Sequence, residues 1–374
     1  YRVFARKGTG FYYMNIKPLQ IGEKTAALPL IQGGMGVGVS LSGLAGAVAR
    51  EGGIGVISTA QIGFREPDFP DNSKEANLRA MVSELKQAKK IAAKADGSCD
   101  GLIGYNIMTA TRDYPDYVKA AAKAGADVII SGAGLPVDMP EYVKGTDTKI
   151  APIASSEKAA RIILKMWDRH YKRTADFLII EGPHAGGHLG FSNEELSHIG
   201  EKGFDFSYDL EIQKIIACVR GYEKKFQTSI PVILAGGIMN APQVRHAFSL
   251  GADGVQVATP FVTTEECDAS EAFKQAYVNA RAEDIEIIKS PVGMPARAIR
   301  NAFLEKMRLG RENITKCYRC LEKCNPKEAP YCITQALIRS VQGDVENGLI
   351  FCGDNVQYLD RISTVSQVIR GLFA

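Results

Sequence analysis

Eight short apolar segments, each followed by glycine or small polar residues, recur along the first two thirds of the chain. They lie at 28–32, 54–58, 102–107, 127–131, 149–153, 177–180, 231–235 and 254–257. Segments with the spacing of amphipathic helices separate them. Eight strands that alternate with helices over about 245 residues are typical of a closed (β/α)8 barrel, the TIM barrel. An open doubly wound sheet is the alternative fold, and the count of eight favours the barrel.

The polar and glycine residues that end these strands are expected to meet on one face. In a (β/α)8 barrel the catalytic groups lie on the loops that follow the carboxyl ends of the strands. Here those ends carry GGMG at 33–36, Asn106, SGAG at 131–134, EGPHAGGH at 181–188, AGG at 235–237 and QVAT at 256–259. We therefore expect this face to hold the active site.

The sixth strand opens into the most distinctive loop of the chain, at 181–190. The loop is rich in glycine and carries His184 and His188, two of the five histidines. Glycine lets the backbone approach a ligand closely, and histidine can transfer a proton near neutral pH. The alternative is a turn whose histidines are merely solvated. The Gly182–Pro183 turn leads us to expect that His184 points away from the site.

Two glycine pairs and a third loop that ends in threonine favour the binding of a phosphate group without a metal. They include Gly186 and Gly187, Gly236 and Gly237, and the segment from Gln256 to Thr259. The loops after strands seven and eight form the usual phosphate site of such barrels, where backbone N–H groups and a hydroxyl serve as donors. Ordinary connecting turns are the alternative interpretation.

The order of the segments predicts three regions. Residues 1–13 precede Met14 and are interpreted as a tag or upstream extension, and residues 14–264 as the barrel. Residues 265–374, here called the tail, cannot extend a closed barrel, so we expect a helical cap over the catalytic face. The tail contains a cysteine-rich insert at about 310–335.

Composition excludes several functional classes. The chain is 45% hydrophobic and 23% charged with a net charge of +3, which is too small to indicate binding to nucleic acid or a membrane surface. No apolar run is long enough to span a membrane, and no signal peptide is visible. We expect a cytoplasmic protein whose partner is a small-molecule substrate, and a homodimer is compatible with this sequence.

Four of the eight cysteines lie close together in the tail. Cys317, Cys320, Cys324 and Cys332 have the spacing C-x2-C-x3-C-x7-C. Four thiolates at such spacing can hold a [4Fe–4S] cluster or a zinc ion, and we favour the iron–sulfur cluster. Disulfides are the alternative, but nothing marks the chain as secreted.

Taken in order, these motifs resemble the nitronate monooxygenase family, formerly called the 2-nitropropane dioxygenases. The flavin-dependent enoyl-acyl-carrier-protein reductases belong to the same superfamily. The matching pieces are IQGGMG at 31–36, NIM at 106–108, SGAG at 131–134, EGPHAGGHLG at 181–190, PVILAGGI at 231–238 and GADGVQVAT at 251–259. In the tail, MPARAIRN at 294–301 and GDVENG at 343–348 resemble the reductase branch.

The resemblance implies that FMN binds in the mouth of the barrel. It implies that Gly34 and Met35 face the flavin ring system, that Asn106 forms a hydrogen bond to it, and that His188 is the catalytic histidine. The implied flavin-binding set is Gly33, Gly34, Met35, Asn106, Glu181, Gly186, Gly187, Gly236, Gly237, Gln256, Ala258 and Thr259. Glutamate at 181 is the residue of the reductases, and its charge is expected to make the flavin's surroundings less electropositive. His184 matches nothing in the family, and neither does the cysteine-rich insert.

Two enzymatic hypotheses follow from the resemblance. The first is an FMN-dependent oxidation of alkyl nitronates or nitroalkanes by O2 to carbonyl compounds and nitrite, with His188 as base or as orienting group. The alternative is an NAD(P)H-dependent enoyl-thioester reductase, towards which Glu181 and the tail motifs lean. A non-catalytic flavin-binding or metal-sensing barrel is a third hypothesis, which the presence of His188 makes less favourable.

Overall fold

The computed structural model describes residues 16–198 and 208–374. The predicted tag or extension at 1–13 lies outside the described residues. None of the helices in the described part of the chain combines the length and apolarity that a membrane span requires.

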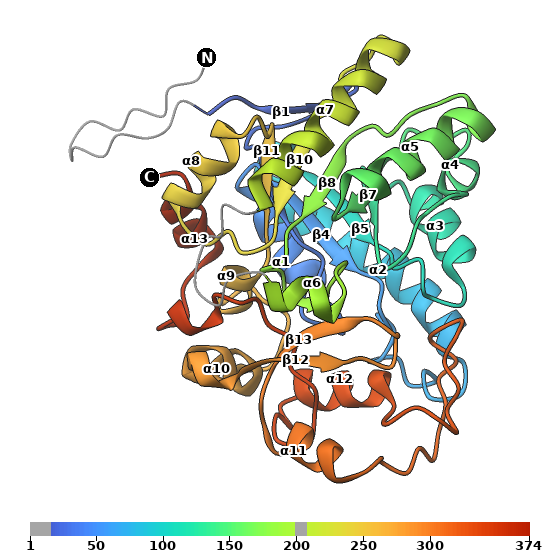
Figure 1. Ribbon diagram of the computed structural model, residues 1–374, viewed down its shortest axis with the longest axis vertical. Helices are drawn as coiled ribbons and strands as arrows, with labels where there is room; N and C mark the ends of the chain where they lie inside the picture. The colour runs from blue at the N-terminus through green and yellow to red at the C-terminus, as the bar shows by residue number, and fades with distance from the viewer. Residues whose placement is uncertain (1–15, 199–207) are drawn as a thin grey trace.

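Eight parallel strands close into a barrel, which confirms the predicted (β/α)8 fold (Figure 1). The strands are β3 (Leu30–Gln32), β4 (Ile54–Ser58), β5 (Leu102–Asn106), β6 (Val128–Ser131), β7 (Lys149–Ala154), β8 (Leu178–Glu181), β10 (Val232–Ala235) and β11 (Gly254–Val257). They pair in chain order, and β11 pairs with β3 to complete the circle. The open doubly wound sheet is therefore excluded.

Helices of very different length surround the barrel. They are α1 (Ser42–Arg50), α2 (Ser73–Ala92), α3 (Tyr114–Lys123), α4 (Met139–Tyr142), α5 (Glu157–Tyr171), α6 (Asn193–His198), α7 (Asp209–Phe226), α8 (Ala241–Ser249) and α9 (Thr259–Val262). Helix α5 has a defined cap at each end. The Ser156 side chain caps it by accepting a hydrogen bond from the Ala159 N–H at 3.2 Å, and Lys172 ends it in a left-handed conformation.

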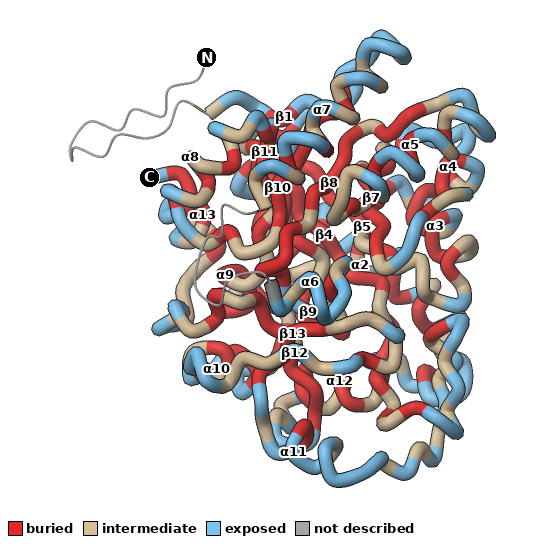
Figure 2. Tube along the Cα trace, viewed as in Figure 1, coloured by how far each residue is buried: buried red, intermediate tan, exposed pale blue. Residues whose placement is uncertain are grey.

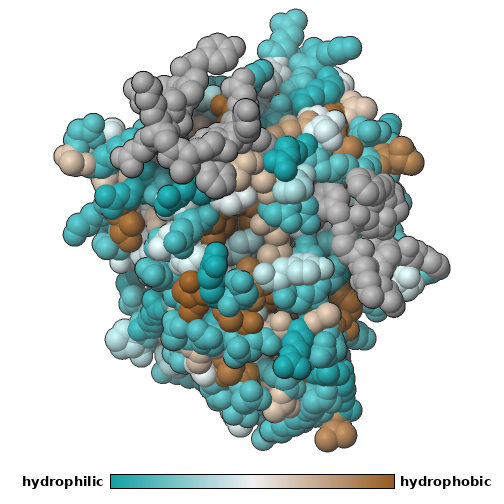
Figure 3. All heavy atoms as spheres, turned by 90° about the vertical axis from the view of Figure 1, so that its left-hand side faces the viewer, coloured by the Kyte–Doolittle hydropathy of each residue, from teal (hydrophilic) through white to brown (hydrophobic). Residues whose placement is uncertain are grey.

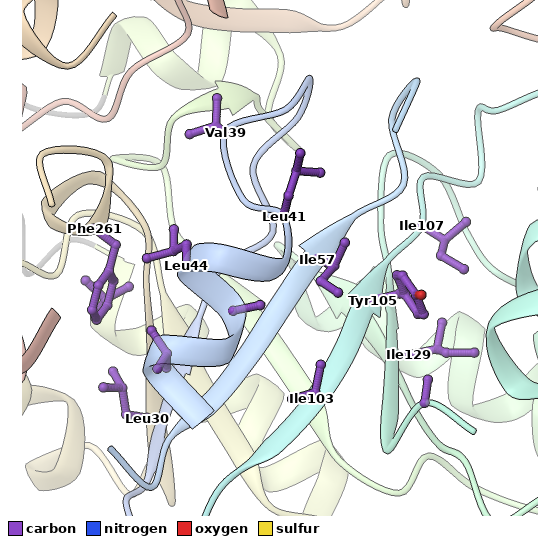
Figure 4. Packing of buried hydrophobic residues seen from close by; sticks show 14 of the residues in the cluster. Leu30, Val39, Leu41, Leu44, Ile57, Ile103, Tyr105, Ile107, Ile129 and Phe261 are labelled. Carbon is purple, nitrogen blue, oxygen red and sulfur yellow. The ribbon is translucent and has the colours of Figure 1, made fainter. Parts of the chain in front are cut away.

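The core has two layers, which Figure 2 shows as the buried centre of the barrel and the buried faces of its helices. Ile54, Ile130 and Ile179 belong to the cluster inside the barrel. Leu44 of α1 and Ile57 of β4 belong to the larger cluster between strands and helices (Figure 4). Alternating strand residues thus serve two layers, which is why the strands are apolar throughout.

A short hairpin covers the amino end of the barrel. It consists of β1 (Leu19–Ile21) and β2 (Lys24–Ala26), which pair antiparallel. Leu19, Ile21 and Ala26 are buried against the inner barrel cluster. With this end covered, the barrel opens only toward the carboxyl ends of its strands.

The tail covers the carboxyl end of the barrel. The sequence predicts a helical cap, but the tail contains strands as well as helices. It contains α10 (Glu271–Asn279), β12 (Ile285–Lys289), β13 (Pro295–Ile299), α11 (Ala302–Leu309), α12 (Ile333–Val341) and α13 (Val365–Leu372). Strand β13 pairs with β12 and with β9 (Gly187–His188) in the loop after β8. The isoleucine-rich segment of β12 favours a strand, and β9 gives its hairpin an edge to pair with.

Helix α13 replaces a helix that the barrel lacks. Strand β11 is followed only by the single turn of α9, so the last β/α unit is short of one helix. Helix α13 packs against α1, α8 and α9 and fills this position (Figure 1). Thr364 and Gln367 form a capping box at its start. The two ends of the described fold are therefore held against each other.

The side of the molecule on which α8 and α13 lie is mainly hydrophilic, as Figure 3 shows. Outside its grey atoms, hydrophobic side chains are scattered over this face in several small groups. We find no broad apolar band there, and scattered apolar side chains are normal on a protein surface.

Candidate functional site

A cavity of about 260 Å³ lies at the carboxyl end of the barrel, between the strand loops and the tail. Every residue predicted to bind flavin lines this cavity, and so does the predicted catalytic histidine. These residues are Gly33, Gly34, Met35, Asn106, Glu181, Gly186, Gly187, His188, Gly236, Gly237, Gln256, Ala258 and Thr259. The structure thus brings the predicted set together, while the role of each residue toward a flavin stays a prediction.

Glycines along the cavity wall keep backbone where a side chain would not fit. A Cβ atom on Gly34 would lie 2.4 Å from the Cβ of Asn106, and one on Gly186 would lie 2.7 Å from the carbonyl group of Cys352. A Cβ on Gly237 would lie 2.7 Å from the Cβ of His184, and the φ angle of Gly237 is +90°. Glycine is therefore required at these positions, and the backbone stays accessible to a ligand.

Two polar residues end separate strands of the barrel wall. Asn106 is the last residue of β5, and its side-chain amide forms no hydrogen bond with the described residues. Glu181 is the last residue of β8, and burial raises its pKa to about 7. A substantial fraction of Glu181 is therefore neutral at pH 7. The fixed negative charge expected from the sequence becomes a carboxyl group that titrates near neutrality.

His188 is held between the barrel and the tail. Its Nε2 lies 2.7 Å from the Oγ of Ser290, and its ring meets Phe351 edge to face at 5.0 Å between centroids. The Ser290 Oγ also accepts the N–H of Val292 at 3.3 Å. Burial lowers the pKa of His188 to about 4, so the ring is neutral at pH 7.

His184 lines the same cavity, so the expectation that it points away from the site is wrong. Its Nδ1 lies 2.6 Å from the Oδ2 of Asp354, and the residue is only 9% exposed. Its Nε2 is buried and has no partner among the described residues. The return of the tail at Asp354 turns the ring inward, and the local Gly182–Pro183 sequence does not reveal this long-range contact.

Arg297 fixes the backbone of the loop that carries both histidines. This buried residue of β13 donates hydrogen bonds to the carbonyl oxygens of Pro183, at 3.0 Å, and of Ala185. Its Nε lies 3.7 Å from the Oδ1 of Asp354. Burial lowers the pKa of Arg297 and the charge of Asp354 opposes this effect, so the two groups form a buried ion pair.

The cysteine-rich insert lies over the loops that follow β4 and β5. Tyr318 stacks on Phe69 with ring centroids 5.4 Å apart, and the Arg112 N–H donates to the carbonyl oxygen of Cys320 at 3.2 Å. Leu321 forms an isolated bridge with Thr111. These contacts dock the insert on the barrel through its backbone and aromatic side chains.

The structure does not support the predicted iron–sulfur or zinc site. In the ranges 16–198 and 208–374, no group of three or more histidine, cysteine or acidic side chains is arranged to hold a metal ion. The four predicted ligands, Cys317, Cys320, Cys324 and Cys332, are free cysteines. Cys320 and Cys324 pack against the apolar cluster that contains Leu321 and Ile333. The contacts of the insert with the barrel therefore hold these thiols in positions that do not form a metal site.

One wall of the cavity is apolar and comes mainly from the tail. We call it the apolar wall, and it consists of Met108, Val292, Leu321, Ile333, Leu337 and Phe351. Only Met108 belongs to the barrel. Because Phe351 and Val292 also flank His188, the apolar wall begins beside the histidine and continues along α12.

Several site residues escaped the sequence interpretation because they come from the tail. Ser290, Arg297 and Asp354 lie 102, 114 and 170 residues from their partners in the 183–188 segment. The MPARAIRN motif at 294–301 was a signal that part of the tail matters. The motif gave no indication of which residue its arginine contacts.

Comparison with known proteins identifies relatives over most of the chain. The family model described as nitronate monooxygenase matches residues 17–374. A protein of Staphylococcus saprophyticus named "Probable nitronate monooxygenase" is 26% identical over 311 residues, which are 79% of this chain and 81% of that protein. A protein of the same name from Staphylococcus aureus strain Newman is 26% identical over 75% of this chain and 77% of its own.

Solved structures support the same relationship. The structure of FabK from Thermotoga maritima has a TM-score of 0.67 and is 26% identical in sequence. The match covers 92% of this chain and 91% of the FabK chain. A nitroalkane oxidase from Streptomyces ansochromogenes has a TM-score of 0.66 over 93% of this chain and 95% of its own, but its 19% identity shows the fold alone. With its barrel, its site residues on one cavity and a family match that spans residues 17–374, the chain belongs to the nitronate monooxygenase family, within a superfamily of flavin oxidoreductases.

Proposed function

We propose that the protein is an FMN-dependent oxidoreductase that oxidises alkyl nitronates or nitroalkanes with O2 to carbonyl compounds and nitrite. Membership of the nitronate monooxygenase family supports this reaction. The observation that carries the proposal is the neutral, buried His188 at the junction of a glycine-lined cavity and the apolar wall. This arrangement offers a hydrogen-bond donor to a small anionic head group and an apolar surface to its alkyl chain.

The cavity has the features that an FMN molecule requires. Gly34, Gly186 and Gly237 expose backbone where a Cβ would collide with neighbouring atoms, so a planar ring system and a phosphate ester can approach closely. The amide of Asn106 and the Nε2 of His184 are polar groups without partners among the described residues. When bound, FMN supplies the redox chemistry by accepting electrons from the substrate.

His188 favours a nitronate over a neutral nitroalkane as the substrate. A nitronate is already deprotonated, so it needs only orientation, which the N–H of a neutral imidazole provides. A nitroalkane must first lose a proton, and this step is slow and depends on His188, because a histidine with a pKa of about 4 is a weak base. The edge-to-face contact with Phe351 covers one side of the ring and limits its access to water.

Measurement of products under air tests this proposal. Protein reconstituted with FMN should consume O2 and release nitrite from alkyl nitronates, and more slowly from the corresponding nitroalkanes. Parallel assays at equal substrate concentration compare the rates of nitrite release from the nitronate and from the nitroalkane. If neither the nitronates nor the nitroalkanes release nitrite while flavin is bound at full occupancy, the proposal is contradicted.

An NAD(P)H-dependent enoyl-thioester reductase is the second candidate. Glu181 favours it, because a carboxyl group with a pKa of about 7 can carry a proton at neutral pH. Arg297, which belongs to the reductase-like tail motif, contacts the backbone of the loop that carries both histidines. Anaerobic mixing with NADH separates the candidates, since rapid bleaching of the flavin supports the reductase and its absence supports the monooxygenase.

A further inference from the structure

The imidazole of His184 has an unusual combination of surroundings. One nitrogen, Nδ1, is 2.6 Å from the carboxylate of Asp354, and the other, Nε2, is buried with no partner among the described residues. A buried polar atom without a hydrogen bond costs about 1–3 kcal/mol. Such an atom at the wall of a ligand cavity indicates that a partner arrives with the ligand.

Backbone N–H groups without partners among the described residues lie close to His184. The N–H groups of Gly236, Gly237 and Gly353 donate no hydrogen bond to the described residues, and all three glycines line the cavity. A Cβ on Gly237 would touch the Cβ of His184, and one on Gly353 would lie 2.4 Å from the Oγ1 of Thr259. Donors from two separate segments therefore lie beside His184. Clustered donors of this kind recognise a group with several acceptor oxygens.

Charged side chains hold His184 in place. Although burial opposes ionisation of Asp354, the hydrogen bond from His184 and the charge of Arg297 hold the pKa of Asp354 below its ordinary value. The carboxylate has Arg297 as a counterion at 3.7 Å. With Nδ1 directed at Asp354, Nε2 is the ring nitrogen left for a ligand.

We propose that His184, held by Asp354, binds the phosphate ester of the flavin through Nε2–H, together with the backbone donors of Gly237 and Gly353. This inference rests on the proposed flavin function and assigns a residue that the motifs of the chain left without a role. His184, which the sequence led us to expect outside the site, thus supplies a charge-assisted contact to the cofactor. Arg297 supports this contact indirectly by holding the loop and balancing Asp354.

Comparison of FMN with riboflavin, which lacks the phosphate, isolates this contact. The full-length protein is freed of flavin and titrated with each compound, and binding is followed by flavin fluorescence. His184→Gln should weaken FMN binding by about ten- to a hundredfold, as expected for loss of a charge-assisted hydrogen bond. Riboflavin binding should change by less than about twofold, since the rest of the cavity is untouched.

Two further variants complete the experiment. Asp354→Asn should weaken FMN binding in the same selective manner, and it keeps the test available if His184→Gln does not fold. His188 lies on the same loop as His184, and His188→Gln should leave the ratio of FMN to riboflavin affinity unchanged. Equal losses for both flavins in His184→Gln, or unchanged FMN affinity, would overturn the inference alone. Failure of the wild-type protein to bind either flavin would overturn the proposed function together with it.

Discussion

At the scale of single residues, the site is built from groups whose protonation differs from that of the same side chains in water. His188 is neutral at pH 7 because desolvation of its ring lowers its pKa to about 4. Glu181 titrates near neutrality because desolvation raises its pKa to about 7, and it forms no ion pair with the described residues. Both shifts arise from burial, and they have opposite consequences for the charge of the site.

Replacement of His188 tests its part in the reaction. His188→Ala should keep FMN, because the glycine loops are unchanged, and should lose at least about a hundredfold in turnover of a neutral nitroalkane. The loss on a preformed nitronate should be smaller, since only orientation is lost. Steady-state kinetics with flavin content measured in each sample provide the comparison. Near-normal turnover on both substrates at full flavin occupancy would remove His188 from the mechanism.

Replacement of Glu181 tests the pKa of its carboxyl group. The folded-state pKa of about 7 lies above the ordinary value of 4.5, so the folded protein binds this proton more tightly than the unfolded chain. Stability from this group is therefore present at low pH and is lost as the pH rises from about 4.5 to 7. Glu181→Gln should raise the free energy of unfolding at pH 8 by about 1–3 kcal/mol and leave it unchanged at pH 4. Urea denaturation of the flavin-free protein at both pH values measures this, and equal effects at the two values would contradict the assignment.

Sequence reasoning located the residues that the barrel itself contributes to the site. The glycine loops and His188 follow buried strands, so their position was determined by local pattern and by the closure of the barrel. His184 and Ser290 could not be interpreted in this way. The orientation of each depends on one contact with a residue more than a hundred positions away, and no local pattern encodes that contact.

At the scale of helices and strands, local signals determined most of the barrel. Strands β4 and β11 have the predicted bounds, because apolar runs and glycines define their ends. Strand β8 is shifted by one residue and includes Glu181, since its pairing with β10 extends to Ala235. The hairpin of β12 and β13 was missed, because its pairing with β9 depends on tertiary contact.

Helix α13 should be as important for stability as any helix of the barrel. Ile369 is buried where α13 packs against α1, α8 and α9, so Ile369→Ala should lower the free energy of unfolding by about 2–5 kcal/mol. Arg370, the next residue, is exposed and serves as the matched control, with an expected change within about 0.5 kcal/mol for Arg370→Ala. Chemical denaturation of both variants gives the comparison. Similar stability of the two would show that α13 is not part of the cooperative fold.

At the scale of the whole molecule, the barrel and the tail divide the site between them. The barrel contributes the glycine loops, Asn106 and Glu181, and the tail contributes most of the apolar wall. The composition of the chain is that of an ordinary globular protein. It could not indicate that the tail enters the cavity, because this depends on the path of residues 310–350 over the loops of the barrel.

The tail should therefore select substrates by the length of their alkyl chain. Leu337→Phe adds volume to the apolar wall on α12 and should reduce turnover of long-chain nitronates by about tenfold relative to nitronates of two or three carbons. Leu337→Ala should shift the preference toward longer chains. Relative kcat/KM values across a series of chain lengths test both changes. An equal effect on all lengths would mean that the substrate does not extend along α12.

The contact between α13 and α1 has a consequence for the synthesis of the protein. Ribosomes deliver the chain from its amino end, so residues 42–50 emerge more than three hundred residues before the helix that packs beside them. During this time the apolar gap between α8 and α1 has no cover, and an incomplete barrel offers it to other chains. Because long-range contacts form slowly, the nascent protein should depend on chaperones until Val365–Leu372 has left the exit tunnel. Ribosome-bound chains stalled before Val365 should accordingly be digested by protease, while released full-length chains resist it.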